Sequence, residues 1–280
     1  MKQKRLFLGL SGITILAGIL TFAFLPSKTK VETPQKEATD TIVKANLSFV
    51  GDLMCHAEQF HYAKLTIAPD SFDFKPCFEY ILPCTRWPDM LVGNLETTLS
   101  GAKPGYTGYP QFNTPDEYLD AVKDAGFDFL VTSNNHSMDK GEAGLLRTLD
   151  MLEKANMPHT GTYRSQRDRD SIRVMDLKGT KISFLNYTYG TNGLPLPAGK
   201  PWTLNMIDTT LIRKDVAAAR KISDLVVVLY HYGNEYERQP GTYQKMCVKK
   251  AIDSGADIII GSHPHVVQPM MMSAPESMAS

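Results

Sequence analysis

Polar residues able to bind metal ions or to transfer protons follow five of the apolar runs in this sequence. The stretch SNNHSMDKG, at positions 133–141, is the richest, because two asparagines, a histidine and an aspartate come soon after the apolar run FDFLV. The other four clusters are GD, GNLE, HYGNE and GSHPH, at positions 51–52, 93–96, 231–235 and 261–265. Turn chemistry accounts for any single cluster, since Gly, Asn and Asp favour turns, but five together predict one shared site.

The side chains of these clusters offer oxygen and imidazole ligands and no thiolate. Such donors suit Zn, Mn or Fe better than a structural site built from cysteines would. A carboxylate can bridge two ions while His and Asn fill the other positions, and two ions about 3.5–4 Å apart commonly serve phosphate-ester hydrolysis. The sequence therefore predicts a divalent metal centre that holds one or two ions.

The apolar runs before these clusters have the composition of buried strands, and helical patterns lie between them. Predicted strands cover residues 45–52, 88–96, 127–136, 180–189, 224–235 and 256–265, and predicted helices cover residues 115–126, 142–157, 209–223 and 241–255. This alternation predicts an α/β fold whose largely parallel sheet is covered on both faces. Ligand sites in such sheets lie beyond the carboxyl ends of the strands, so the five clusters are expected at one edge.

Composition and charge agree with a globular protein and exclude one class of partner. The chain has 280 residues, of which 42% are hydrophobic and 21% charged, as is ordinary for one large domain or two small ones. Lysine plus arginine and aspartate plus glutamate both number 30. This balance gives no basic face for nucleic acid, so no nucleic-acid partner is expected.

The N-terminus carries a membrane-targeting pattern. A basic start, MKQKR, precedes an uncharged apolar stretch at residues 6–25, which is about as long as a bilayer-spanning helix requires. No A-x-A-like cleavage site follows, so residues 1–25 are predicted to form an uncleaved, single-pass signal-anchor in the cell membrane. Residues 26–44 are then a flexible linker to an extracytoplasmic domain at residues 45–280. A cleaved signal peptide, which gives a secreted protein, is the main alternative, and a buried core helix is another.

The four cysteines, Cys55, Cys77, Cys84 and Cys247, do not form a paired C-x-x-C zinc pattern. Outside the membrane, Cys77 and Cys84 could form a disulfide. Free buried thiols are an equal alternative, and the sequence does not decide between the two.

Five segments carry a resemblance to a known family: LSFVGDLM, GNLETTLSG, SNNHSMDKGEAGL, VVVLYHYGNEYERQP and DIIIGSHPHVVQP. In order and spacing they resemble the motifs of CapA/PgsA-type proteins of poly-γ-glutamate capsule synthesis and export, over roughly residues 46–269. The resemblance implies a calcineurin-like metallophosphatase fold, a layered α/β/β/α sandwich, behind a membrane-anchored N-terminus. It also implies subunits of a capsule or polyglutamate synthase complex as partners, and an anionic polymer or a phosphoester as substrate.

Within this resemblance, six residues match metal ligands by position: Asp52, Glu96, Asn135, His231, His263 and His265. Glu96 stands where metallophosphatases have a bridging carboxylate. His136 matches the histidine that steadies the reacting group or protonates a leaving oxygen, and Asp139 is expected to orient it by fixing its tautomer. Asn94 and Glu235 are expected to face the substrate or to support the ligands.

Two features depart from the metallophosphatase pattern. Those enzymes have Asp-x-His in the first motif, whereas this chain reads Asp52-Leu53-Met54, with His56 nearby but out of register. One well-held ion and one weak ion are therefore expected. The sequence also ends in MMMSAPESMAS, where the family continues into a further strand and a YSLGNF-like segment, so missing strands and an exposed sheet edge are expected.

Two functions remain open at this point. In the first, the protein is a metal-dependent hydrolase or transferase outside the cell, in which the metal polarises a phosphoryl or carbonyl oxygen and His136 acts as an acid. In the second, it is a non-catalytic component of a capsule synthase complex that uses the metal site to hold an anionic polymer. The ligand set favours metal binding under both readings, and the missing first-motif histidine favours the second.

Overall fold

The computed structural model describes residues 42–65, 68 and 70–272. The predicted signal-anchor and residues 26–41 of the predicted linker lie outside this range. Among the helices that are described, none is long and apolar enough to cross a membrane.

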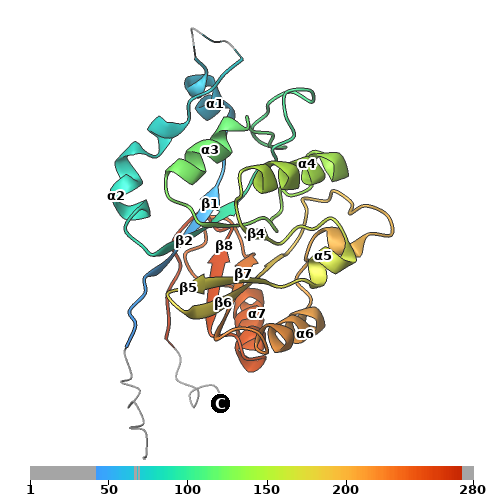
Figure 1. Ribbon diagram of the computed structural model, residues 1–280. Helices are drawn as coiled ribbons and strands as arrows, with labels where there is room; N and C mark the ends of the chain where they lie inside the picture. The colour runs from blue at the N-terminus through green and yellow to red at the C-terminus, as the bar shows by residue number, and fades with distance from the viewer. Residues whose placement is uncertain (1–41, 66–67, 69, 273–280) are drawn as a thin grey trace, which may run out of the picture. The chain divides into compact units, whose positions relative to one another are not determined.

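Two four-stranded sheets form the centre of the described chain, and both are largely parallel (Figure 1). The first has the order β1-β2-β3-β4, with all neighbours parallel. The second has the order β5-β6-β7-β8, and only β5 runs antiparallel to its neighbour. The strands are β1 Leu47–Leu53, β2 Met90–Leu95, β3 Phe129–Val131, β4 His159–Thr160, β5 Arg173–Leu177, β6 Thr180–Thr188, β7 Leu225–His231 and β8 Ile258–Ser262.

Helices cover the outer face of each sheet. Figure 1 shows α1, α3 and α4 on one side of the sheets and α6 and α7 on the other. The α-helices are α1 Ala57–Ala63, α2 Leu82–Thr85, α3 Glu117–Asp124, α4 Gly141–Lys154, α5 Gln166–Asp170, α6 Thr209–Ala219 and α7 Thr242–Asp253, and short 3₁₀ turns are Lys75–Cys77, Glu79–Ile81 and Pro201–Thr203. Local chemistry sets their starts: Asp208 caps α6 by accepting hydrogen bonds from the backbone of Thr210 and Leu211, both at 2.8 Å.

The inner faces of the two sheets pack directly on each other. Phe129 of β3 and Phe184 of β6 stack with ring centroids 4.5 Å apart, and Val92 and Val227 are fully buried in the same cluster. Leu91, on the opposite face of β2, packs instead against the helical side. Alternate residues of one strand thus enter different cores, which confirms the α/β/β/α layering and explains the near-continuous apolar runs.

Several expectations from the sequence need correction. The alternation of strands and helices predicted one sheet covered by helices on both faces, whereas each sheet has helices on one face and the other sheet on its second face. The strand predicted at residues 127–136 ends at Val131, because the following residues turn into the polar cluster. The short strands β4 and β5 and the helices α1, α2 and α5 were not predicted.

The cysteines are all free, so Cys77 and Cys84 do not form the disulfide that the sequence left open. Both are exposed rather than buried, while Cys55 and Cys247 are buried. The sequence also led us to expect an exposed sheet edge near the C-terminal end. Within the described residues, β8 is the edge strand of the second sheet, and its isoleucines are half-buried.

Candidate metal centre

Asp52 lies near the end of β1, immediately after an irregularity in the strand. The register between β1 and β2 shifts between Phe49 and Asp52. A bulge of this kind bends a strand and re-aims the side chain that follows it. Beyond the bulge, Asp52 pairs with Asn94 in register, and its Oδ1 accepts a hydrogen bond from Asn94 Nδ2 at 2.8 Å.

Asn94 connects the acidic and imidazole groups of the cluster. Besides its bond to Asp52, Asn94 Nδ2 lies 3.4 Å from Glu96 Oε2 and 3.2 Å from His231 Nδ1. Its own oxygen accepts a hydrogen bond from Asn134 Nδ2 at 3.1 Å. Because Asn94 is buried at the end of β2, one amide fixes side chains from both sheets.

His231, the last residue of β7, is fully buried and turns one ring nitrogen toward the first sheet. His231 Nε2 lies 2.6 Å from Asn135 Oδ1 and 3.5 Å from Glu96 Oε1. The other nitrogen, Nδ1, lies 3.0 Å from Ser262 Oγ at the end of β8. Nε2 therefore faces two candidate oxygen ligands, while Nδ1 has a hydroxyl that can hold the ring in place.

His263 and His265 follow β8 in a strained turn. Their φ angles are 95° and 55°, a left-handed region that few non-glycine residues adopt. The backbone N–H of His263 donates to Asp52 Oδ2 at 3.1 Å, and His265 Nδ1 lies 3.0 Å from the same oxygen. The ring of His263 is centred 4.7 Å from that of His231. The turn thus carries both imidazoles into the cluster formed by the other strand ends.

Burial and charge set the protonation of the cluster. Burial lowers the pKa of His231 to about 3 and that of His263 to about 4, so both rings are neutral near pH 7. Burial would raise the pKa of Asp52, but the hydrogen bond from His265, the charge of His231 and the hydrogen bond from Asn94 together outweigh it and lower the pKa. Burial and the charge of Asp52 raise the pKa of Glu96. The neutral His231 and His263 are in the state that a metal ion requires. The hydrogen bond with Asp52, in contrast, raises the pKa of His265, so an arriving ion would displace protons from His265 and Glu96.

The donor atoms converge closely enough to hold a cation. Two groups have ligand atoms within 4.8 Å of one another, Glu96 with His263 and His265, and Asp52 with Glu96 and His231. Within the described residues, Glu96 Oε1 and His263 Nδ1 are buried without a hydrogen-bond partner. Unpaired buried polar atoms are costly unless something binds them. Carboxylate and imidazole donors with these two free atoms fit a divalent cation.

His136 and Asp139 form a buried pair beside this cluster. His136 Nδ1 lies 2.7 Å from Asp139 Oδ2, which also accepts the backbone N–H of Phe112 at 2.6 Å. The ring of Phe112 meets that of His136 edge-on, with centroids 4.7 Å apart. His136 is near enough to the cluster for its charge to oppose the burial that raises the pKa of Glu96. The predicted contact between His136 and Asp139 is therefore present in the structure.

The segment after β6, at residues 189–200, also reaches the cluster, and the sequence reasoning missed it. The ring of Tyr189 is centred 4.8 Å from that of His263, and its backbone N–H donates to His231 O at 3.0 Å. Asn192 Oδ1 accepts a hydrogen bond from Asn135 Nδ2 at 3.2 Å. The sequence reasoning looked for polar side chains just after each predicted strand. It ended this strand at Tyr189, whereas β6 ends at Thr188, so Tyr189 was counted as a strand residue.

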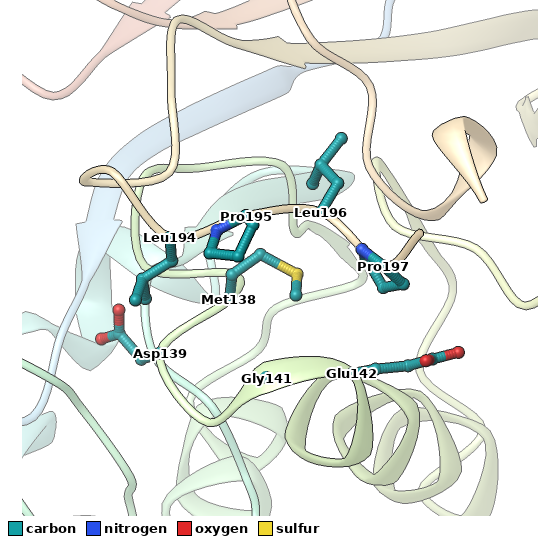
Figure 2. A pocket seen from close by; sticks show the side chains of 8 residues that line it. All are labelled: Met138, Asp139, Gly141, Glu142, Leu194, Pro195, Leu196 and Pro197. Carbon is teal, nitrogen blue, oxygen red and sulfur yellow. The ribbon is translucent and has the colours of Figure 1, made fainter. Parts of the chain in front are cut away.

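Farther along, the same segment crosses the start of α4. Figure 2 shows Leu194, Pro195, Leu196 and Pro197 facing Met138, with which they line a cavity of about 290 Å³ together with Asp139, Gly141 and Glu142. Lys200 Nζ pairs with Glu142 Oε1 at 2.5 Å beyond the cavity. These contacts hold the segment against the polar turn that carries Asn135 and His136.

Other predicted or excluded residues lie outside the central group. Glu235 is exposed, although its charge adds to the burial that raises the pKa of Tyr189, so it stands at the rim of the site. His56 precedes α1, is exposed and contacts Phe112 edge-on at 5.0 Å, so it does not replace the missing first-motif ligand. His159 contacts the Met157 carbonyl away from the cluster.

The motifs that build this site match a family as a whole. The profile of the bacterial capsule synthesis protein PGA_cap covers residues 46–277. The chain belongs to this family. The resemblance to CapA/PgsA-type proteins drawn from five segments of the sequence is thereby confirmed.

Two Bacillus proteins are similar to this chain over most of its length. The chain is 32% identical to the PGA biosynthesis protein CapA of Bacillus subtilis over 261 residues, which cover 90% of this chain and 65% of that protein. It is 29% identical to the capsule biosynthesis protein CapA of Bacillus anthracis over 265 residues, covering 91% and 62%. The chain thus spans less than two thirds of the length of the relatives that it matches.

Solved structures offer only a distant likeness. The NAD nucleotidase NadN of Haemophilus influenzae aligns with a TM-score of 0.42 and 14% identity over 68% of this chain and 32% of its own. The sulfate thiohydrolase SoxB of Thermus thermophilus aligns with the same TM-score and identity over 70% and 34%.

Proposed function

We propose that this chain is a metal-dependent hydrolase or transferase of capsule biosynthesis, acting on a poly-γ-glutamate chain or on a phosphoester. The observation that carries the proposal is the convergence of carboxylate and imidazole donors in which Glu96 Oε1 and His263 Nδ1 are buried without a hydrogen-bond partner. Family membership supports the biological setting, since the two Bacillus relatives are named for PGA and capsule biosynthesis.

We assign the ligands from the geometry of the cluster. Glu96 belongs to both groups of donors, and it would hold the ion together with Asp52, Asn135, His231, His263 and His265. Asn94 holds Asp52, Glu96 and His231 in position through its side-chain amide. When bound, a divalent ion such as Zn, Mn or Fe polarises a phosphoryl or carbonyl oxygen of the substrate.

The pair formed by His136 and Asp139 favours catalysis over simple binding. Asp139 Oδ2 accepts a hydrogen bond from the backbone N–H of Phe112. This bond orients the Asp139 carboxylate toward His136 Nδ1, which the same oxygen contacts. An ionised Asp139 then selects the tautomer of His136 that carries its proton on Nδ1, and a protonated His136 keeps that contact. His136 Nε2 is left to donate a proton to a leaving oxygen, which is the task of a general acid.

A specific observation favours a second function, that of a non-catalytic component which holds an anionic polymer. Leu53 and Met54 follow Asp52, and Leu53 is buried in the apolar core, so this motif supplies no histidine to a second ion. One ion held by the remaining donors would suffice to bind a carboxylate or a phosphate without turning it over.

A turnover assay separates these two functions. Purified full-length protein, with Mn or Zn added, would be incubated with phosphoesters and with γ-glutamyl polymer, beside metal-stripped protein and His136→Ala. The proposal predicts turnover that requires both the metal and His136. Binding of the polymer by the metal-loaded wild type, with no turnover of any substrate, would favour the polymer-holding component instead.

We also propose where this activity takes place. The basic start and the uncharged stretch at residues 6–25 support a single-pass membrane anchor with the described domain outside the cytoplasm, next to other subunits of a capsule synthase complex. Protease added to intact cells should then digest the domain. A domain that stays protected until the cells are lysed would show that the orientation is wrong.

A further inference from the structure

The side-chain amide of Asn135 is held at both of its ends. Its oxygen, Oδ1, lies 2.6 Å from His231 Nε2 within the metal-ligand cluster. Its nitrogen, Nδ2, donates to Asn192 Oδ1 at 3.2 Å, away from the cluster. Asn135 is buried, and the Tyr189 hydroxyl also lies within hydrogen-bonding reach of its side chain.

The direction of this amide decides whether Asn135 can bind a cation. Only the carbonyl oxygen of an asparagine has lone pairs to offer, whereas the amide nitrogen presents two N–H donors. The two ends are nearly the same size, so hydrogen bonds rather than shape determine which end faces the cluster. A flipped Asn135 would point two donors at the ion and would weaken its binding.

His231 cannot fix this direction once a metal is bound. In the metal-free protein, a proton on His231 Nε2 can bond to Asn135 Oδ1 and so favour the correct orientation. A metal-binding imidazole nitrogen must give up its proton, so that hydrogen bond is lost when the ion arrives. Asn192 Oδ1, on the other side, remains as an acceptor that holds the amide nitrogen away from the cluster.

Asn192 suits this task because of the backbone it occupies. Its φ angle is 51°, in the left-handed region where asparagine is among the few tolerated residues other than glycine. Next to it, Thr191 is buried, and the backbone N–H of Leu194 bonds back to Thr191 O at 2.9 Å. The ion pair of Lys200 with Glu142 fastens the far end of the segment. Asn192 itself is exposed, and these contacts of the loop present its side-chain oxygen to Asn135.

We propose that Asn192 is a positioning residue that keeps the carbonyl oxygen of Asn135 directed at the metal ion. This inference rests on the proposed metal centre. It explains why a residue of the second sheet's connecting loop reaches a ligand that belongs to the first sheet. Asn192 must supply a hydrogen-bond acceptor to Asn135 Nδ2. Whether the side chain that carries this acceptor is neutral or charged is not essential.

The test is Mn²⁺ affinity, measured by calorimetry on purified full-length protein with two substitutions at one position. Asn192→Gly keeps the left-handed backbone but removes the acceptor, and should weaken Mn²⁺ binding by about 10-fold or more, as losses of ligand-supporting groups do. Asn192→Asp places an ionised carboxylate at this position, which accepts hydrogen bonds and donates none. This variant should bind Mn²⁺ at least as tightly as the wild type. Melting temperatures of the metal-free variants show whether the fold is intact.

A matched control exists in the same chain. Asn156 also has a left-handed backbone, with φ 49°, and is exposed like Asn192, but it lies just after α4, away from the cluster. Asn156→Gly should leave Mn²⁺ affinity unchanged. Wild-type affinity in Asn192→Gly, or equal weakening in Asn192→Gly and Asn192→Asp, would overturn the role of Asn192 while leaving the metal centre in place. A wild type that binds no metal would overturn both.

Discussion

His265 Nδ1 lies 3.0 Å from Asp52 Oδ2, and this contact joins the loop after β8 to β1, near opposite ends of the described chain. Neither sheet builds the cluster alone, since Asp52 and Glu96 come from the first sheet and His231 and His265 from the second. The site therefore exists only when both sheets are packed on each other. Its predicted properties follow from that shared construction.

The first prediction concerns the two histidines after β8. His263→Ala combined with His265→Ala should remove most of the bound metal, because both imidazoles belong to one donor group with Glu96. His61→Ala and His159→Ala, each made alone, should keep it, since neither residue belongs to a donor group. Metal content of the purified proteins by mass spectrometry checks this. Equal loss of metal in all of the variants would mean that the site has been misplaced.

The second prediction concerns His136. His136→Ala should leave the metal in place but lower turnover by roughly 10²–10⁴-fold, the range typical of a lost general acid. Asp139→Asn should cost less, because Asp139 acts only through the imidazole that it orients. Metal content, melting temperature and turnover are measured on the same preparations.

The structural alternative for the stretch SNNHSMDKG, a plain turn, makes a different forecast for those two variants. Both changes would then lower the melting temperature and leave the rate per folded molecule unchanged. A His136→Ala protein with a normal rate would remove the catalytic role.

The strand ends were predictable because their apolar runs are long and buried on both faces. Leu91 and Val92 are neighbours in β2 but are buried in different cores, so both must be apolar. The sequence of β2 is therefore a continuous apolar run, followed by Asn94 and Glu96. Hydrophobic periodicity reports burial but not the type of element that buries a face. For that reason the pattern alone could not separate two sheets from one, and the resemblance to a known family supplied the second sheet.

The contacts that complete the site were hidden for other physical reasons. Tyr189 continues the aromatic run of β6, so it reads as one more strand residue. Asn192 stands in a segment rich in Gly and Pro, which predict only a loop. Asn94 is recognisable as a candidate, but its central position depends on the bulge in β1 and on pairing between distant strands.

The third prediction concerns the stability of the domain away from the site. Arg169 Nη1 donates to Asp215 Oδ1 at 2.9 Å, both side chains are buried, and Tyr187 Oη donates to Asp215 Oδ2 at 2.7 Å. Arg169→Ala leaves a buried carboxylate without its cation and should lower the free energy of unfolding by about 3–5 kcal/mol. The control is Lys249→Ala, which breaks an exposed pair with Asp253 and should cost less than about 0.5 kcal/mol. Urea unfolding measures both, and equal losses would contradict the burial of the first pair.

The fourth prediction is a pH dependence of the metal-free protein. Burial lowers the pKa of His263 to about 4 from an ordinary value of 6.5. Because the folded-state pKa is depressed, the stability contributed by His263 is fully present above pH 6.5 and is lost as the pH falls through about 4. At about 1.4 kcal/mol per pKa unit, this loss is at most about 3.5 kcal/mol. In EDTA, His263→Asn should therefore lose less unfolding free energy than the wild type between neutral pH and about pH 4. Parallel curves for the two proteins would contradict the assignment.

The most direct test of the metal centre is the number of divalent ions that the purified full-length chain retains. Elemental analysis after gel filtration in metal-free buffer should find about one ion of Zn, Mn or Fe per chain, with a second held only when metal is in excess. Chelator-treated protein should then bind added metal in a calorimeter. No retained ion, together with no heat of binding for Zn²⁺, Mn²⁺ or Fe²⁺, would contradict the account.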